Sequence, residues 1–300
     1  MKILLAVDGS AYSRKAVEFV ASRKTLAESS PDVHVLNVRL RLSAYPARIV
    51  GMAAVREYYA DEAEKILKTA RQRLQKAGFN PNVRFLVGHP PAEISAAADK
   101  ADVDLLILGS KGHSALAGML LGSVTQEVLV RTDRPVLVVR GKKATYSDSL
   151  RVGIAVDGSP YGTAAARYVL RHAELFGASP SISLIHVVHT YDLVGLPSLE
   201  GIAPPAFSAA EVHAMQDKAF ESAMEPVRKV LTTAGVTATE VRLVGPAGDE
   251  LSRHAKKKLD VLVMGSHGYG AFKSAVMGSV ATRVLAHSEI PLLLIRRSGR

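Results

Sequence analysis

The sequence predicts an α/β fold in two tandem copies, each a parallel β-sheet covered by helices on both faces. The length of 300 residues fits two domains of ordinary size. One set of landmarks occurs twice: Val-Asp-Gly-Ser at residues 7–10 returns at 156–159, and a glycine pattern at 109–123 returns at 265–279. Short apolar runs alternate with amphipathic stretches of helical length, which is typical of a parallel sheet with crossover helices.

Ten strands are predicted from apolar runs without polar alternation, a pattern typical of strands buried on both faces. The runs are Ile3–Val7, Val33–Val38, Val83–Val87, Leu105–Leu108 and Val136–Val139 in the first copy, and Val152–Val156, Ile182–Val188, Ala238–Val244, Val261–Met264 and Leu292–Ile295 in the second. We expect each set of five strands to lie in the order 3-2-1-4-5, so that the first strand ends beside the fourth.

Four long amphipathic helices are predicted between these strands, at Ser13–Glu28, Tyr58–Ala77, Thr163–Phe176 and Ala210–Ala234. Gly78 and Gly235 follow two of them, at the position where a glycine commonly ends a helix. The three lysines at 256–258 are expected to end a further helix, where cations suit the helix dipole.

The repeat sets the domain boundaries. We expect a first domain at 1–143, a linker at 144–149, which is polar and has no periodicity, and a second domain at 150–300. The copies differ most after the second strand, at Arg39–Glu57 and at Thr190–Ala210. Long loops in a compact domain are usually functional, which favours lids over the carboxyl ends of the strands. The alternative is that both segments are solvent-exposed loops without a role in binding.

Each copy carries the pattern Gly-x2-Gly-x9-Gly-Ser after its fourth strand. Glycine lets a backbone approach a ligand closely, and successive N–H groups in such a loop can hold a phosphate. A helical stretch follows, and a helix N-terminus attracts anions. Ser123 is expected to cap that helix in a capping box with Gln126, whereas Thr282 replaces the glutamine in the second copy. Identical spacing in both copies favours a phosphate site over simple tight turns.

Asp8 and Asp157 stand at the end of the first strand of each copy. A carboxylate there could accept a hydrogen bond from an adenine amino group or a ribose hydroxyl. The alternative is an N-cap for the helix that follows, and both roles can hold at different oxygens.

These residues, together with Arg-Pro-Val-Leu-Val-Val at 134–139, resemble the universal stress protein family over nearly the whole chain. The resemblance implies two Rossmann-like domains, each a five-stranded parallel sheet with four helices. It also implies membership of the branch that carries the glycine pattern and binds ATP, with or without Mg²⁺. The family often has an arginine after the second glycine of the pattern, but His113 and Tyr269 stand there in this chain.

The resemblance assigns a binding role to eight residues in each copy. In the first copy it implies adenine contacts at Asp8 and Val38, and ribose and phosphate contacts at Leu108, Gly109, Gly112, Gly122, Ser123 and Val124. In the second copy the matching residues are Asp157, Val187, Met264, Gly265, Gly268, Gly278, Ser279 and Val280.

The composition of the chain and the motifs that it lacks exclude several classes of function. The net charge of +10 suits an anionic partner, and the absence of cysteine excludes disulfides and thiolate sites. No apolar run is long enough for a membrane span, and Asp8 comes too early for a signal peptide, so a cytoplasmic protein is expected. The chain has no P-loop and no Gly-x-Ser-x-Gly elbow, and its 5% aromatic content makes nucleic-acid binding an unlikely role.

Three functions remain open. The first is an ATP-binding stress or regulatory module with two nucleotide sites. The second is a slow ATPase or a phosphoryl or adenylyl transferase, which would need a base, a metal ligand or an arginine beside the phosphates; the sequence repeats none in both copies. The third is a module for another ligand, such as a flavin, a lipid-like molecule or nucleic acid. No catalytic residue and no metal site are predicted.

The last strand of each copy gives an expectation about assembly. Val136–Val139 and Leu292–Ile295 are apolar and would lie at sheet edges, which favours pairing with another strand. We therefore expect the two copies to pack as an intramolecular pseudo-twofold pair, with a further homodimer left open.

Overall fold

The structure is a computed structural model that describes residues 1–41, 44–112, 121–141, 149–188, 208–266 and 277–296. The strands are β1 (Lys2–Ala6), β2 (Asp32–Leu40), β3 (Asn82–Gly88), β4 (Leu105–Gly109), β5 (Val136–Val139), β6 (Arg151–Ala155), β7 (Ser181–Val188), β8 (Thr239–Val244), β9 (Val261–Gly265) and β10 (Leu292–Ile295). The helices are α1 (Ala11–Ala21), α2 (Lys24–Glu28), α3 (Ala44–Lys76), α4 (Pro90–Lys100), α5 (Ser123–Arg131), α6 (Pro160–Arg171), α7 (Ala209–Thr233), α8 (Ala247–Lys258) and α9 (Ser279–His287), with a 3-10 turn at Ala173–Leu175.

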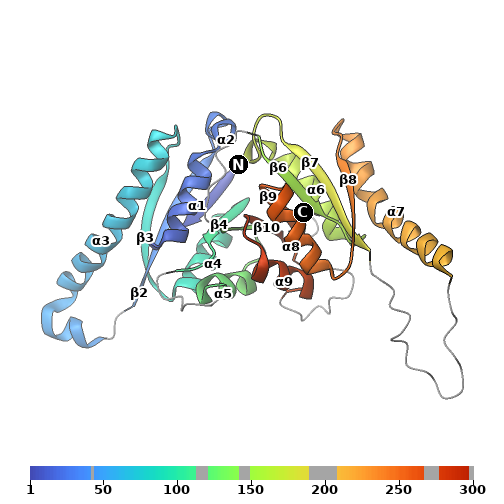
Figure 1. Cartoon of the computed structure of the whole chain (residues 1–300). Helices are drawn as coiled ribbons and strands as arrows, with labels where there is room; N and C mark the ends of the chain where they lie inside the picture. Colours follow the sequence, from blue (N-terminus) through green and yellow to red (C-terminus); the bar gives the residue numbers. More distant parts are fainter. Residues whose placement is uncertain (42–43, 113–120, 142–148, 189–207, 267–276, 297–300) are drawn as a thin grey trace, which may run out of the picture.

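All ten strands form one sheet, in the order β3-β2-β1-β4-β5-β10-β9-β6-β7-β8. Neighbouring strands are parallel within each half, and the two halves meet where β5 and β10 pair antiparallel. In that pairing Leu137 lies opposite Leu293, the residue at its own position in the second copy. The α/β class with a mostly parallel sheet is confirmed, and the two halves spread to either side of the β5–β10 seam (Figure 1).

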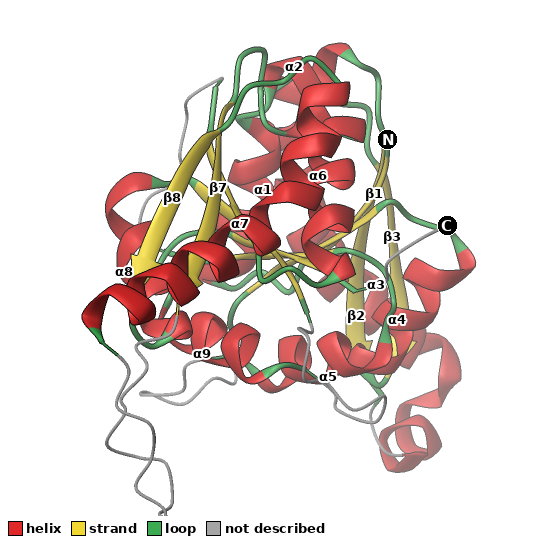
Figure 2. Ribbon diagram, turned by 90° about the vertical axis from the view of Figure 1, so that its right-hand side faces the viewer, coloured by secondary structure: helices red, strands yellow, loops and turns green. Residues whose placement is uncertain are grey.

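Helices cover both faces of the sheet. Successive side chains of a strand point to opposite faces, and since the strands are apolar throughout, both faces need to be buried. Ile3 and Leu5 join the core under α1, α3, α6 and α7, whereas Leu4 and Ala6 join the core under α4, α5, α8 and α9. Each core runs across the seam, since residues of β5 and β10 contribute to both. Figure 2 shows α5 and α9 at the same end of the molecule, as does Figure 1.

Three predicted helices begin or divide differently in the structure. The helix expected at Thr163–Phe176 forms α6, which starts at Pro160 and ends at Arg171, and the 3-10 turn at Ala173–Leu175. The stretch expected as one helix from Ser13 to Glu28 is split into α1 and α2, because the backbone of Ser22 ends α1 and Arg23 is not helical. The loop expected at Arg39–Glu57 is wrong for most of its length: α3 already starts at Ala44 and is broken at Gly51, whose φ of 84° leaves the helical region. The corresponding segment of the second copy, 189–207, lies outside the described residues.

The remaining elements follow the sequence signals closely. Every predicted strand is present, with ends that differ by at most two residues. Helix α8 ends at Lys258, so the three lysines at 256–258 form its last turn as predicted. Helix α7 starts with a capping box, in which Ser208 Oγ accepts from the Glu211 N–H at 3.2 Å and the Glu211 carboxylate accepts from the Ser208 N–H at 2.7 Å.

Candidate functional site

The carboxyl ends of β1 and β4 bring the first group of predicted residues together. Asp8 follows β1 by two positions and is half-buried. Its Oδ1 accepts a hydrogen bond from the Ser10 N–H at 2.9 Å. Its Oδ2 faces Gly112, where a Cβ would lie only 2.7 Å from that oxygen. A side chain at position 112 would therefore have to displace the Asp8 carboxylate.

The start of α5 closes the loop that follows β4. The Gly122 N–H donates to the Ser110 carbonyl at 2.8 Å, and a Cβ on Gly122 would lie 3.1 Å from Lys111 Cα. Ser10 Oγ donates to the Lys111 carbonyl at 3.2 Å and thereby links the loop to the start of α1. Gly122 thus packs directly against the backbone of residues 110–112, next to Asp8.

Gly109 lacks a side chain for a different reason. A Cβ there would lie 2.7 Å from the carbonyl carbon of Tyr12 and 2.8 Å from the nitrogen of Ser13. The first turn of α1 therefore packs on β4 with no room for a methyl group. Thr125 Oγ1 donates to the Gly109 carbonyl at 2.8 Å and fixes α5 to the same strand end.

The capping box expected at Ser123 and Gln126 is wrong, whereas the second copy lacks one, in agreement with the replacement by Thr282. Gly122 and Gly278 are the N-cap residues of α5 and α9, and neither cap has a side-chain hydrogen bond. Ser123 and Ser279 are instead the first helical residues, and both side chains are exposed. Asp8 does not cap α1 either, because Ser10 is the N-cap and accepts from the Ser13 N–H at 3.2 Å. No side chain among the described residues therefore covers the first-turn N–H groups of α5.

Val38 extends β2 beyond the end of β1. The ladder between these strands ends at Ala6 opposite Leu36, and the Val7 N–H donates to the Leu36 carbonyl at 2.9 Å. Backbone groups two residues apart in a strand point to the same side. The Val38 N–H and carbonyl hence point toward the space above the end of β1, where Asp8 stands. Leu108 is buried in β4, and Val124 is half-buried in the first turn of α5.

The second copy repeats this arrangement where it is described. The Val156 N–H donates to the Ile185 carbonyl at 2.9 Å, so the backbone of Val187 points past the end of β6 as that of Val38 does past β1. The Gly278 N–H donates to the Ser266 carbonyl at 2.8 Å, which matches the bond from Gly122 to Ser110. Met264 is buried and Gly265 half-buried at the end of β9, and Val280 is half-buried in α9. Gly268, His113 and Tyr269 lie outside the described residues.

The two copies differ around their aspartates. Asp157 is exposed, whereas Asp8 is half-buried. Asp157 Oδ1 accepts from the N–H of Ser159 at 3.0 Å and from its Oγ at 2.5 Å. In the first copy Ser10 directs its hydroxyl to Lys111 instead. The carboxylate of Asp157 is therefore held by its own turn alone among the described contacts.

Sequence reasoning missed one polar residue in each copy that forms a hydrogen bond at the end of the first strand. Asn37 Nδ2 donates to the Val7 carbonyl at 2.7 Å, and His186 Nδ1 lies 2.7 Å from the Val156 carbonyl. Because a carbonyl only accepts, this histidine nitrogen carries the proton. The two residues are 149 positions apart, like the aspartates, and each is a polar residue inside an apolar run, which is the signal that would have found them.

Positive charge lies close to both strand ends. Arg140 follows β5 and Arg296 follows β10, and the Ser110 N–H donates to the Val139 carbonyl at 3.0 Å beside Arg140. Burial lowers the pKa of both guanidinium groups, which nonetheless stay far above neutral pH. The site therefore combines a carboxylate with backbone N–H groups, and an arginine follows the last strand of each half. Within the described ranges there is no group of three or more side chains of the kinds that ligate metals.

A doubly wound α/β protein of two similar halves, each with a glycine-lined loop at the carboxyl ends of its strands, is the class that this geometry defines. The model of the universal stress protein family matches residues 1–140 and again residues 150–296. The chain belongs to this family, and it contains the family domain twice.

Relatives of both one and two domains match the chain. The universal stress protein MJ0577 of Methanocaldococcus jannaschii is 32% identical over 156 residues, which cover 48% of this chain and 96% of that protein. A universal stress protein of Mycolicibacterium smegmatis is 25% identical over 301 residues, which cover 98% of this chain and 96% of that protein. The match to Slr1230 of Synechocystis spans 42% of that protein, at 34% identity.

A solved structure shares the fold over the whole length. The crystal structure of a universal stress protein from Archaeoglobus fulgidus superposes with a TM-score of 0.66 at 22% identity, and covers 99% of this chain and 96% of the other. No helix in the described part of the chain is both long and apolar enough to cross a membrane.

Proposed function

We propose that the chain binds ATP at two sites, one in each half, and acts as a nucleotide-dependent stress or regulatory module. The observation that carries the proposal is the first-copy constellation in which Asp8, the loop at 109–112 and the uncapped start of α5 meet at the carboxyl ends of the strands. Open α/β sheets bind ligands at this edge, and free N–H groups at a helix start favour phosphate.

The parts of the nucleotide are assigned by their chemistry. The backbone of Val38 and the carboxylate of Asp8 offer acceptors and a donor to adenine and ribose. The N–H groups of the glycine loop and of the α5 start face the phosphates. The second site uses Asp157, Val187, Gly265 and Gly278 in the same roles. Mg²⁺, if present, would be bound by the phosphates of the nucleotide, since the described residues include no cluster of protein ligands for a metal.

Slow turnover is part of the proposal. Backbone N–H groups bind the ground state of a polyphosphate, and binding that is equal in ground and transition states does not accelerate chemistry. A nucleotide that binds only the folded chain stabilises it by about 2.7 kcal/mol at a hundredfold excess over Kd. Thermal melts and phosphate release, measured on one sample with Mg-ATP, separate the two functions. Release slower than about one per minute with a melt shift supports the module; release at several per second indicates an enzyme.

Binding stoichiometry tests the sites themselves. Equilibrium dialysis should give two ATP per chain for the native protein, one for Gly122→Val or Gly278→Val, and none for the double variant. Valine at 122 would press on the backbone of residues 111–112 and close the loop. Gly162→Ala, which replaces a glycine of α6 that has room for a methyl group, is the control and should still bind two. Two bound ATP in the double variant would refute the assignment.

We further propose that the two halves form an intramolecular pseudo-twofold pair. The register at the seam supports this, because Leu137 faces its counterpart Leu293, and Val136 and Val138 face the counterparts of each other. Such a register is the one a twofold axis through the centre of the seam would produce.

A further inference from the structure

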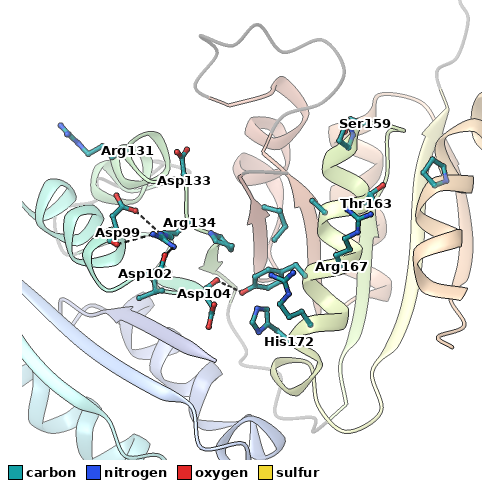
Figure 3. A pocket seen from close by; sticks show the side chains of 18 of the residues that line it. Asp99, Asp102, Asp104, Arg131, Asp133, Arg134, Ser159, Thr163, Arg167 and His172 are labelled. Carbon is teal, nitrogen blue, oxygen red and sulfur yellow. Dashed lines mark hydrogen bonds and ion pairs between the residues drawn. The ribbon is translucent and has the colours of Figure 1, made fainter. Parts of the chain in front are cut away.

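A cleft of about 1180 Å³ lies between the two halves and reaches Gly158 and Ser159, the residues that follow Asp157 (Figure 3). One wall comes from the first half, at residues 99–104 and 131–135, which connect α4 to β4 and α5 to β5. The other wall is a face of α6 in the second half. Pockets for drug-sized molecules usually enclose about 300–1000 Å³, so this cleft has room for a longer ligand.

The α6 wall is a straight row of polar side chains. Ser159, Thr163, Arg167 and Arg171 line the cleft at intervals of four residues, so they follow one face of the helix. Figure 3 shows Ser159, Thr163 and Arg167 along this helix, opposite the wall of the first half. Arg167 and Arg171 are exposed, and neither makes an ion pair with another described residue. Two adjacent positive charges thus face the cleft.

The opposite wall is lined by four aspartates and two arginines, of which Arg131 pairs with Glu127 at 2.7 Å. Arg134 pairs with Asp99 at 3.4 Å and with Asp102, which uses up two of the four aspartates on this wall. Asp104 and Asp133 also line the cleft; neither forms a close salt bridge within the described ranges, although Arg296 interacts with Asp133 and His172 with Asp104. Asp104 Oδ2 accepts only from the backbone N–H of Lys2, at 2.7 Å.

The floor between the walls is apolar and rigid. Val103, Ala164, Tyr168 and Ile295 line it, and Tyr168 Oη donates across the two halves to the Asp104 carbonyl at 3.1 Å. Burial raises the pKa of Tyr168 far above its usual value, so the phenol stays protonated and keeps this bond. This bond links the two walls, and no salt bridge among the described residues joins Arg167 or Arg171 to the aspartates opposite.

The equivalent positions on the other side of the seam are paired within their own half. Glu18 stands in the place of Arg167 and binds Arg73 at 2.7 Å. Glu289 stands in the place of Asp133 and binds Lys256 at 2.7 Å. Asp260 matches Asp104 and binds Arg151 at 2.8 Å. The fold thus satisfies these charges internally on one side and leaves them facing an open cleft on the other.

We propose that this cleft binds an extended peptide segment whose acidic and basic side chains alternate. In an extended chain successive side chains point to opposite sides. A peptide lying along α6 would then present its acidic side chains to Arg167 and Arg171 and its basic side chains to Asp104 and Asp133. Helix α6 has 12 residues and is about 18 Å long, the length of about five or six extended residues.

Two probe peptides of equal composition test the proposal. One is a fluorescent hexapeptide that alternates lysine and glutamate, and the other has three lysines followed by three glutamates; both have blocked ends. Fluorescence anisotropy with the full chain, without nucleotide, should show at least tenfold tighter binding of the alternating peptide. The difference should shrink with added salt, since exposed charges are screened.

Variants locate the binding. Arg167→Ala/Arg171→Ala and the single Asp133→Asn should each weaken the alternating peptide, the first at least tenfold. Lys68→Ala/Lys76→Ala on the exposed face of α3 removes the same charge as the arginine pair and should bind as the native chain does. Unchanged melting temperatures exclude misfolding. Equal binding of both peptides, or loss in the lysine control, overturns the proposal. So does tighter binding by Asp133→Asn, which would mark a site for anions alone.

Discussion

His172 at the end of α6 combines burial with a titratable ring. Its ring packs against Tyr168 at a centroid distance of 4.6 Å, and the residue is 7% exposed. Burial lowers the pKa of His172 below the usual histidine value, although Asp104 and Glu174 act in the opposite direction. The unfolded chain therefore takes up this proton more readily than the folded chain does. This part of the stability is present above about pH 6.5 and is lost as the pH falls below it.

Urea unfolding at pH 7.5 and pH 5.5 measures this effect. The free energy of unfolding of His172→Asn should fall less between the two pH values than that of the native chain. His213→Asn, which replaces an exposed histidine of α7, should fall as much as the native chain. An equal fall in all three proteins would contradict the role given to His172.

Replacement by alanine should have opposite effects on stability at Gly109, which is half-buried, and at Gly162, which is buried. Gly109→Ala places a methyl group 2.7 Å from the backbone of Tyr12 and should lower the free energy of unfolding by about 1–3 kcal/mol. Gly162→Ala meets its nearest neighbour, Val156 Cγ1, at 3.4 Å. Since alanine favours helix, that variant should range from unchanged to about 1 kcal/mol more stable. Chemical denaturation measures the free energy of unfolding of both variants. An equal change in the two variants would contradict the expectation, because the methyl group at position 109 would then fit without a loss of stability.

Helix α7 and helix α5 begin with serines that look alike in the sequence but differ in structure. Ser208 caps α7 through a box with Glu211, whereas Ser123 lies inside α5 and bonds to no backbone N–H at its start. Ser208→Ala should cost about 1 kcal/mol, and Ser123→Ala should be near neutral in the absence of nucleotide. Denaturation curves of the two variants are the measurement. A larger loss for Ser123→Ala would restore the capping role that the sequence suggests.

Strands and helices differ in how well their sequence signals can be read. Buried parallel strands leave nearly continuous apolar runs, so all ten were predictable to within two residues. Helix α4 starts at Pro90-Pro91, and the first turns of α3 contain Pro46 and Gly51, residues that indicate loops when taken alone. Proline is tolerated in a first helical turn, and Gly51 marks a break between two helical segments; neither fact is visible without the backbone.

The candidate site was predictable in part for a similar reason. Asp8, Gly112 and Gly122 are set by a motif, and the structure brings them into contact. The contacts of Asn37, Ser10 and Thr125 depend on which elements lie next to each other in space, and spacing along the chain does not encode that.

The pairing of β5 with β10 at the seam determines how an isolated half would associate in solution. Residues 1–143 alone would expose the apolar edge of β5, and the register at Leu137 allows a second copy to replace β10. We expect this half to sediment as a dimer at micromolar concentration. Leu137→Lys should place two like charges opposite each other and give a monomer or an unstable chain. A stable monomer of the unaltered half would contradict the pairing.

Placing both halves in one polypeptide removes the dependence of that pairing on dilution. A strand tethered to its partner meets it at an effective concentration in the millimolar range, whatever the amount of protein in the cell. In a homodimer every substitution appears in both subunits. In this chain a substitution changes one half only, so it need not be compatible with both positions of a symmetric assembly. The halves have already diverged at corresponding positions: Asn37 corresponds to His186, and Thr125 corresponds to Ala281. In a chain built this way, one half can change its residues while the other half keeps the ones that the two halves once shared.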